Sequence, residues 1–296
     1  MTMRSVEQVA QTQATTATVS DGRWKSRLSA GAITALLIVL TVIWILPLLW
    51  VLDTSLKPES ETTAIPITWL SSAFNFDAYG KVLGASSLPR WYFNSILTSV
   101  ITTVATVILA SMAAFAFSRI PFLGRGVVFG LILAGIMVPS AMLIVPLFTE
   151  VQSLGMVDTY WGIILPQIAS PVAIFIFKQY FDGIPREFEE AAIMDGASRL
   201  RIYWQIWMPL AQPAIAAVAI FAFVASWNNF IWPFIAITGN SMMTVPVGLA
   251  NVQTSYGIRY AQIMASAILG GLPIMVVFLI FQRQIVQGLS ASGLRG

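Results

Sequence analysis

The sequence predicts an all-α, polytopic membrane protein with six transmembrane helices. Three observations support this fold class. Of the 296 residues, 57% are hydrophobic and only 10% are charged, whereas a soluble domain carries about 25% charged residues. Six long apolar runs contain no Asp, Glu, Lys or Arg. Arginine and lysine gather in alternate segments between these runs, as they do on the cytoplasmic side of membrane proteins.

Each apolar run is a candidate membrane span, because about 20 mostly apolar residues cross the hydrocarbon core of a bilayer. The fourth run is short and contains Pro166 and Pro171, and the sixth contains Pro273. Buried helices of a soluble protein usually keep a polar stripe, so six uncharged runs disfavour that alternative. The expected spans are Ala30–Leu52, Phe93–Ser118, Val127–Thr149, Tyr160–Phe177, Ala214–Thr238 and Ile263–Phe281.

The distribution of positive charge predicts the orientation of the spans. If the N-terminus is inside, only four of the 16 Lys and Arg residues fall in outer segments, namely Lys57, Lys81, Arg90 and Arg259. The bias predicts that both termini are cytoplasmic (N-in/C-in). We therefore expect a disordered cytoplasmic tail over 1–29, a membrane domain over 30–287 with a cytoplasmic loop at 182–212, and a cytoplasmic C-terminal tail over 288–296.

Several kinds of chemistry are excluded by composition. The chain has no cysteine and no histidine, which removes disulfides, thiol nucleophiles and the usual zinc ligands. We expect no catalytic residues and no metal site. The chain also lacks a Gly-rich phosphate-binding loop that ends in Gly-Lys-Ser/Thr, so any ATP must be bound by a partner.

The loop at 182–212 carries the most informative pattern. Pro185 suits a first helical position, and Gly196 can adopt the left-handed conformation that ends a helix. Ser198 is a suitable N-cap for a second helix, which carries Tyr203 and Trp207 and suits a place at the membrane interface. From these residues alone, the loop is either a helix that docks into a partner or an amphipathic connector lying on the bilayer.

A longer motif identifies the family that the loop resembles. Glu190-Ala191-Ala192 is followed after three residues by Gly196, after nine more by Ile206, and then by Pro209. This spacing resembles the Glu-Ala-Ala motif of permease subunits of ABC importers, with Met208 in place of the usual Leu. In that family the loop is the coupling helix between spans 4 and 5, which fits a cleft on the ATPase. The resemblance assigns ATPase coupling to Glu190, Ala191, Ala192, Asp195, Gly196 and Ala197.

Two further stretches resemble carbohydrate importers in particular. Trp227-Asn228-Asn229-Phe230 resembles the Trp-Asn-x-Phe segment of carbohydrate-type permeases, and 288–296 resembles the end of the smaller maltose permease subunit. The resemblance implies a multi-pass subunit in the bacterial cell membrane, no enzyme in itself, that imports a sugar-like solute. It implies as partners a second permease subunit, two ATPase subunits that bind ATP and Mg, and an extracytoplasmic solute-binding protein.

Polar side chains within the apolar runs are candidates for a solute path. They are Trp227, Asn228 and Asn229 in the fifth run and Gln167 in the fourth. Aromatic rings can pack against a sugar face and amides can bond its hydroxyls. The alternative, hydrogen bonding between helices, stays open from the sequence. We also expect the outer loop 239–262 to reach the solute-binding protein, as its equivalent does in maltose-type relatives.

Two other functions compete with this interpretation. An ion-coupled secondary transporter usually places Asp, Glu or His within its spans, and these spans contain none. The spacing of Ala192, Gly196 and Ile202 also matches a DNA-binding helix-turn-helix. Only two arginines, Arg199 and Arg201, lie near its second helix, whereas phosphate binding requires a more basic face. We therefore expect no nucleic-acid partner.

Overall fold

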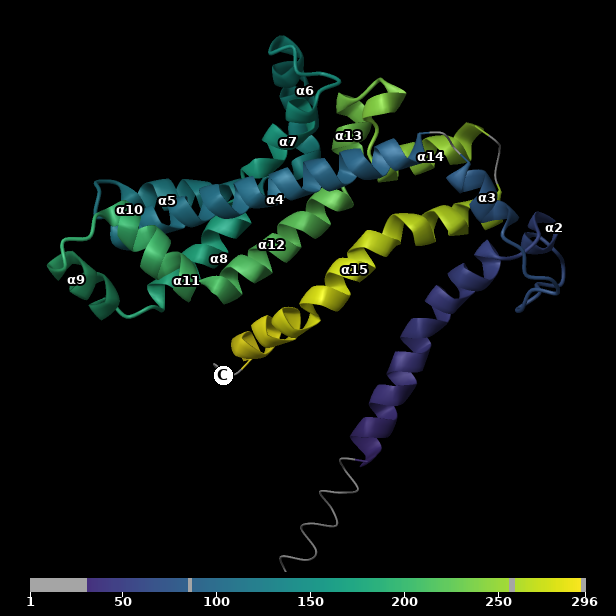
Figure 1. Ribbon diagram of the computed structural model, residues 1–296, viewed down its shortest axis with the longest axis horizontal. Helices are drawn as coiled ribbons and strands as arrows, with labels where there is room; N and C mark the ends of the chain where they lie inside the picture. Colours follow the sequence, from purple (N-terminus) through teal and green to yellow (C-terminus); the bar gives the residue numbers. More distant parts are fainter. Residues whose placement is uncertain (1–30, 85–86, 256–258, 294–296) are drawn as a thin grey trace, which may run out of the picture. The chain divides into compact units, whose positions relative to one another are not determined.

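The computed structural model describes residues 31–84, 87–255 and 259–293, and every regular element among them is helical. The expected tail over 1–29 and the last three residues of the C-terminal tail lie outside the described residues. The chain divides into two units, Met1–Asn75 and Phe76–Gly296. Figure 1 shows the helices of both units.

The first unit consists of a long helix, Gly31–Ser55, and the segment that follows it with α2 (Glu59–Thr62). The buried Lys57 folds this segment against the end of the helix. Its Nζ lies 2.6 Å from Asp53 Oδ2, donates to Thr68 O at 2.7 Å and lies over the Trp50 ring. The Trp50 and Trp69 rings meet edge to face at 5.2 Å. The segment after the first apolar run is therefore ordered.

The second unit is built around α4, which packs against α7, α8, α12 and α14, while α15 packs against α3, α12 and α14 (Figure 1). The described elements are α3 (Asp77–Leu83), α4 (Leu88–Arg119), α5 (Arg125–Ala134), η1 (Gly135–Met137), η2 (Ser140–Leu143), α6 (Ile144–Ser153), α7 (Tyr160–Ile168), α8 (Pro171–Asp182), α9 (Glu187–Met194), α10 (Arg199–Ile202), η3 (Tyr203–Trp207), α11 (Met208–Leu210), α12 (Gln212–Trp227), α13 (Ile231–Ala236), η4 (Asn240–Met242), α14 (Val245–Ser255) and α15 (Tyr260–Gly293).

A stripe of small polar residues explains the central place of α4. These residues, some of them in adjacent pairs, recur about once per helical turn and are buried. In a membrane helix such residues let neighbouring backbones approach closely and supply hydrogen bonds between helices. The stripe consists of Asn94, Ser95, Thr98, Ser99, Thr102, Thr106 and Ser111.

Three helices are long and apolar enough to cross a membrane singly: Gly31–Ser55, Leu88–Arg119 and Tyr260–Gln282. They contain the first, second and sixth expected spans almost completely. Three further pairs qualify only as bent combinations: Arg125–Met137 with Ser140–Ser153, Tyr160–Ile168 with Pro171–Asp182, and Arg199–Leu210 with Gln212–Trp227. By length and composition, the described residues therefore hold three candidate spans, or up to six if each bent pair is one span.

The third and fourth expected spans are each built from two helices with a bend between them. The third pair is bent by 96° and the fourth by 45°. Both bends lie directly before a proline, where the preceding residues leave the helical region: Val138 before Pro139, and Ala169 and Ser170 before Pro171. The proline ring disfavours a helical conformation for the residue that precedes it, so sequence chemistry accounts for the bends.

The fifth expected span, Ala214–Thr238, is also not one helix. Helix α12 ends at Trp227, and the short α13 packs against α6 and α7 (Figure 1). Asn228 and Asn229 therefore lie in a break between two helices and not inside a span. At the other end, α12 is bent by 80° from the preceding helical segment. At the break, Asn229 Oδ1 accepts from Trp232 N at 3.3 Å.

Position 248 in α14 has room only for glycine, because a buried side chain packs directly against its Cα. A Cβ atom there would lie 2.3 Å from ring atoms of the buried Trp91, whose Nε1 donates to Asn240 O at 3.0 Å. We expect Gly248→Ala to destabilise the protein by about 1–3 kcal/mol through overpacking and to lower its unfolding temperature in detergent. Gly271→Ala in α15 is the control, because its Cβ would meet nothing within 4 Å. Equal unfolding temperatures of both variants would contradict the expectation.

Candidate functional site

The loop between α8 and α12 forms a helix, a turn and a second helical segment, as the sequence predicts. Helix α9 begins at Glu187 after the N-cap Arg186, so the expectation that Pro185 occupies the first helical position is wrong. Three glutamates lie in the first turn, Glu187, Glu189 and Glu190, where the helix dipole favours negative charge.

Gly196 ends α9 in the predicted left-handed conformation, with φ of 76°. The Ala197 N–H donates to Ala192 O and the Gly196 N–H donates to Ile193 O, each at 2.9 Å. This pair of bonds is the Schellman motif that satisfies the last carbonyls of a helix. Ser198 Oγ then accepts from Arg201 N at 3.3 Å and caps α10. Both sequence predictions for this turn are confirmed.

The second helical segment differs from the expected interfacial helix. Ile202, Tyr203 and Trp207 are buried in the hydrophobic core of the unit. Tyr203 and Trp207 contact Phe115 of α4, and Tyr203 Oη lies 2.7 Å from Ser111 Oγ. A π-helical turn, η3, brings these side chains onto α4. The segment thus anchors the loop to the helix bundle.

Arg119, the last residue of α4, connects α4 to both ends of the loop between α8 and α12. Its Nη2 donates to Phe181 O at 2.6 Å and to Ile184 O at 2.7 Å, at the C-terminal end of α8. Its Cζ lies 4.2 Å from the centre of the Trp207 ring, a cation–π distance. We call Arg119, Phe181, Ile184 and Trp207 the Arg119 clamp. It joins α4, α8 and η3 at one point.

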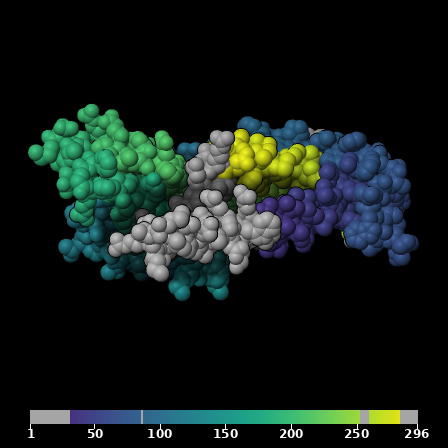
Figure 2. Space-filling model, turned by 90° about the horizontal axis from the view of Figure 1, so that it is seen from below, coloured from purple at the N-terminus to yellow at the C-terminus, as the bar shows by residue number. Residues whose placement is uncertain are grey.

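The residues assigned to coupling lie on both sides of α9. Ala192 is buried in the core, whereas Glu190, Ala191, Asp195 and Gly196 are exposed and Ala197 is half-buried. Of the two alanines, only Ala191 is open to a partner. Helix α9 lies at one end of the second unit (Figure 1), and Figure 2 shows this green segment at the surface.

The exposed side of α9 is partly apolar. Met194 is 87% exposed, and Phe188 is half exposed. Next to it lies an open hollow of about 610 Å³, lined by residues from the ends of α4 and α8, from the α8–α9 turn and from α9, five of them charged. An apolar rim beside a charged hollow is a surface that a protein partner can recognise. The charged residues of the hollow are Arg119, Asp182, Arg186, Glu187 and Glu190.

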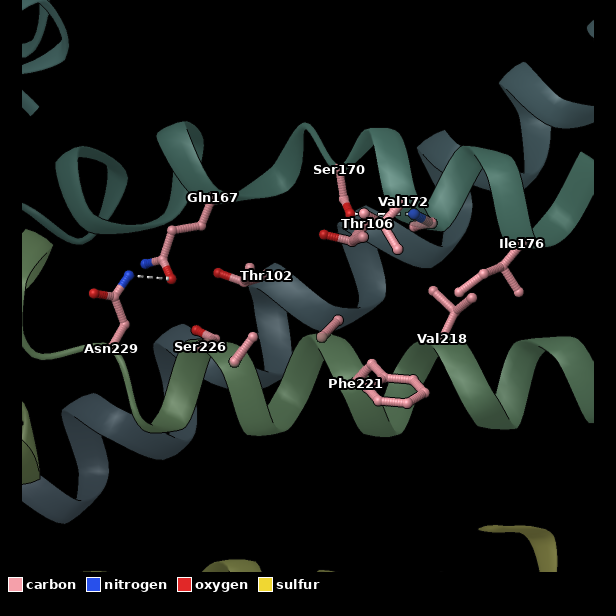
Figure 3. A pocket seen from close by; sticks show the side chains of 13 residues that line it. Thr102, Thr106, Gln167, Ser170, Val172, Ile176, Val218, Phe221, Ser226 and Asn229 are labelled. Carbon is pink, nitrogen blue, oxygen red and sulfur yellow. Dashed lines mark hydrogen bonds between the residues drawn. The ribbon is translucent and has the colours of Figure 1, made fainter. Parts of the chain in front are cut away.

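A second site is a pocket of about 440 Å³ between α4, the α7–α8 bend and α12. Asn229 Nδ2 donates to Gln167 Oε1 at 3.0 Å at its polar end (Figure 3). Thr106 Oγ1 donates to Ile168 O at the bend, where the helix break leaves carbonyls without partners. Among the described residues, no group of three or more acidic, His or Cys side chains could hold a metal ion.

The structure brings together two of the four residues predicted for the solute path. Gln167 and Asn229 both line the pocket, whereas Trp227 and Asn228 do not. Trp227 is buried elsewhere, and its Nε1 donates to Gly270 O at 3.0 Å, so its role in the fold is to join α12 to α15. The expectation that Asn228 faces the same site is not met, because it lies exposed beyond the end of α12.

Sequence reasoning missed several residues of the pocket. Thr102 and Thr106 belong to the polar stripe of α4, a signal that was present in the spacing of small polar residues within an apolar run. The sequence could not distinguish Phe221 from the other apolar residues of α12, because no pattern indicates which face of this helix lines a pocket. The missed lining residues are Thr102, Thr106, Val172, Ala173, Ile176, Val218, Phe221, Ala222, Ala225 and Ser226.

The segment 239–262, which we expected to form an outer loop, is partly helical and is hydrogen-bonded to α4. Asn94 Nδ2 donates to Ser241 O and Met243 O, each at 2.9 Å, and residues 245–255 form α14. The Asp158 carboxylate accepts bonds from the Thr238 hydroxyl and from the N–H groups of Gly239 and Thr238. These bonds lower the pKa of Asp158, so it stays charged at neutral pH. Among the residues of this segment whose side chains the structure describes, Asn240, Ser241, Asn251 and Tyr260 are exposed.

Comparisons with known proteins agree with these features. A family described as binding-protein-dependent transport system inner membrane component matches residues 106–291. The arabinooligosaccharides transport system permease protein AraQ of Bacillus subtilis (strain 168) is 35% identical over 90% of this chain and 95% of that protein. The trehalose transport system permease protein SugB of Mycobacterium tuberculosis (strain CDC 1551 / Oshkosh) is 36% identical over 85% and 93%. A chain of a bacterial ABC transporter that imports the acidic polysaccharide alginate shares the fold, with a TM-score of 0.74 at 24% identity and coverage of 87% and 96%.

Proposed function

Because the chain belongs to the family of inner membrane components of binding-protein-dependent transport systems, we propose that it is the smaller permease subunit of a carbohydrate importer. The observation that carries the substrate class is the similarity along almost the whole chain to permeases for arabinooligosaccharides and trehalose. The permease itself does no catalysis, and the energy comes from ATP hydrolysed by a partner subunit.

The proposed arrangement has six spans with both termini in the cytoplasm. Two of the bent pairs, Arg125–Met137 with Ser140–Ser153 and Tyr160–Ile168 with Pro171–Asp182, then each cross the membrane once. The fifth crossing begins with α12, and the permease domain covers 30–287 between the tails 1–29 and 288–296. The positive charge of the inner segments supports this orientation. It places the loop 182–212, between the fourth and fifth spans, on the cytoplasmic side.

In this orientation α9 is the coupling helix and docks onto the ATPase. Its support is the exposed surface of Glu190, Ala191, Asp195 and Gly196 beside the apolar side chain of Met194. Ala192 contributes from the inner side, because its small side chain lets α9 pack closely on the core. Ala197 supplies the second bond of the turn. The residues of the motif therefore divide into contact and support.

The Arg119 clamp provides a route from this docking surface to the spans. A displacement of α9 acts on the α8–α9 turn, which Arg119 holds to the end of α4. Helix α4 in turn packs against α7, α8 and α12, the helices that surround the pocket. We propose that closure of two ATPase subunits moves α9 and thereby switches the membrane halves, formed with a second permease subunit, between inward and outward access.

The solute enters from an extracytoplasmic binding protein and passes the pocket beside α4. Gln167 and Asn229 are the predicted path residues that line this pocket. Trp227 supports the path by fixing the end of α12 through its bond to Gly270 O. Asn228 is exposed at the same break, and we assign it to the mouth of the path.

Charge reversal at Glu190 tests the coupling assignment. In proteoliposomes that contain the assembled transporter, ATP and loaded binding protein, we expect Glu190→Lys to lower sugar uptake by at least about tenfold, since like charges brought together at an interface cost several kcal/mol. Stimulation of ATP hydrolysis by loaded binding protein should fall with it. Glu150→Lys, an equal change on the exposed surface of α6, should leave both unchanged. Normal uptake and normal stimulation in Glu190→Lys would refute the coupling role.

A further inference from the structure

The pocket beside α4 has two chemically different ends (Figure 3). Gln167, Asn229, Thr102 and Ser226 gather at one end, and these side chains are amides and hydroxyls. Toward the other end, the lining is apolar and includes Phe221, which is 68% exposed. The pocket is thus amphipathic, with hydrogen-bonding groups and an open aromatic ring within one cavity.

Two hydroxyl groups at the polar end have no partner among the described residues. Thr102 is only 2% exposed, and its Oγ1 is buried without a hydrogen bond. Ser226 Oγ, from the facing helix α12, is buried in the same way. Buried polar atoms are nearly always hydrogen-bonded in folded proteins. Two unpartnered hydroxyls in one pocket therefore indicate a ligand that supplies the missing donors and acceptors.

The charge of the lining restricts that ligand. All 13 lining residues are uncharged, so an anionic solute would lose its hydration without gaining a counter-charge from this chain. The N-terminus of α8 adds little, because Pro171 has no N–H and Ser170 Oγ already accepts from Ala173 N. A carboxylate or sulfonate is therefore a poor ligand for this wall.

A neutral sugar ring matches both ends of the pocket. Its hydroxyl groups are donors and acceptors around the rim, and its C–H face is apolar and packs on an aromatic ring. The volume of about 440 Å³ lies in the usual range of small-molecule sites. Phe221 and the amide pair Gln167–Asn229 offer these two kinds of contact.

We propose that this subunit contacts the transported solute directly in this pocket, and that the pocket selects uncharged, polyhydroxylated solutes over acidic ones. Thr102 and Ser226 are the specificity-determining residues, and each hydroxyl bonds the solute. The inference rests on the proposed import function and adds to it the chemical class that this permease accepts.

The native absence of cysteine gives a direct test of this pocket. Ala225 lines the pocket and is exposed, so Ala225→Cys places the sole thiol of this chain there. In the detergent-purified assembled transporter without binding protein, we expect millimolar maltose, trehalose or arabinobiose to slow maleimide labelling of this chain at least about threefold. Glucuronate, a sugar of the same ring type with a carboxylate, should not slow it. Ala141→Cys, at an exposed position outside the pocket, should label at one rate throughout.

Variants that remove the hydroxyls of Thr102 and Ser226 test whether these groups bind the sugar. In the Ala225→Cys background, Thr102→Val and Ser226→Ala should abolish protection by the uncharged sugars, and Thr102→Ser should restore it. Ser99→Ala is the matched control, because Ser99 Oγ is also buried without a partner on α4 but lies outside the pocket.

Three outcomes would overturn the proposal: no protection by any uncharged sugar, equal protection by glucuronate, or protection that survives loss of both hydroxyls. Uptake by the wild-type transporter is measured separately in proteoliposomes. If uptake is normal while protection fails, the pocket assignment is wrong and the import function stands. If no sugar is imported, the proposed function itself fails.

Discussion

Gly196→Val is expected to lower ATP-driven uptake by more than tenfold while the transporter still assembles in the membrane. Gly196 has φ of 76°, and nothing lies within 4 Å of the position of its Cβ, so the change causes no collision. The cost is in the backbone, where an L-residue in the left-handed region costs roughly 1–2 kcal/mol and a β-branched one more. Relief of this strain breaks the two bonds that end α9 and turns the docking surface away from the ATPase.

Gly124→Val is the matched control for this variant. Gly124 has φ of 77° and equally open surroundings, but it precedes α5 and lies outside the loop 182–212. It therefore carries the same backbone strain without disturbing α9. Uptake and the ATPase stimulation by loaded binding protein are measured for both variants in proteoliposomes. Equal losses in both would mean that strain alone, and not the turn after α9, explains the defect.

Arg119→Ala is expected to have the second large effect, on stability and on coupling together. It removes two charged hydrogen bonds to Phe181 O and Ile184 O and the cation–π contact with Trp207. A hydrogen bond to a charged group contributes about 1.5–3 kcal/mol and a cation–π contact about 0.5–2 kcal/mol. With partial access of water to Arg119, we expect a loss on the order of 3 kcal/mol, seen as a lower unfolding temperature in detergent.

Loss of the Arg119 clamp in Arg119→Ala should also uncouple ATP hydrolysis from transport. Helix α9 would still meet the ATPase, because its exposed residues are unchanged, but its motion would no longer be transmitted to α4. We expect ATP hydrolysis to continue with several-fold less sugar transported per ATP. Arg119→Lys keeps the charge but loses the forked geometry of the guanidinium, so it should recover stability in part and coupling less. An unchanged transport-to-hydrolysis ratio in Arg119→Ala would limit Arg119 to a structural role.

The clamp was not predictable from the order of residues. Arg119 ends an apolar run, and in the sequence it counts only as one of the positive charges at the inner side of a span. Its partners are two backbone carbonyls of α8 and an aromatic ring of η3, which are more than 60 residues away along the chain. Backbone carbonyls carry no residue identity, so no sequence pattern records such contacts.

Local chemistry predicted the turn after α9 correctly. Gly196 and Ser198 take the conformations expected of a helix C-terminus and an N-cap, because these preferences depend on steric freedom and on side chains that reach only their own backbone. The failure at Pro185 and the bends at Pro139 and Pro171 have the same local origin. Proline restricts the conformation of the residue before it, so these positions bend the apolar segments.

The sequence by itself determined the helical membrane class, the approximate positions of the apolar segments, and the motif that carries the family. These depend on composition, on runs of about 20 apolar residues and on fixed spacings, all of which are local properties. The packing of the helices established which side of α9 is buried and which amides meet in the pocket. It also established that Thr102 and Ser226 line the same pocket without hydrogen-bond partners. In a helix that is apolar on all sides, hydrophobicity does not distinguish one face from another. The faces that enclose the pocket are therefore set by the packing of α4 against α8 and α12.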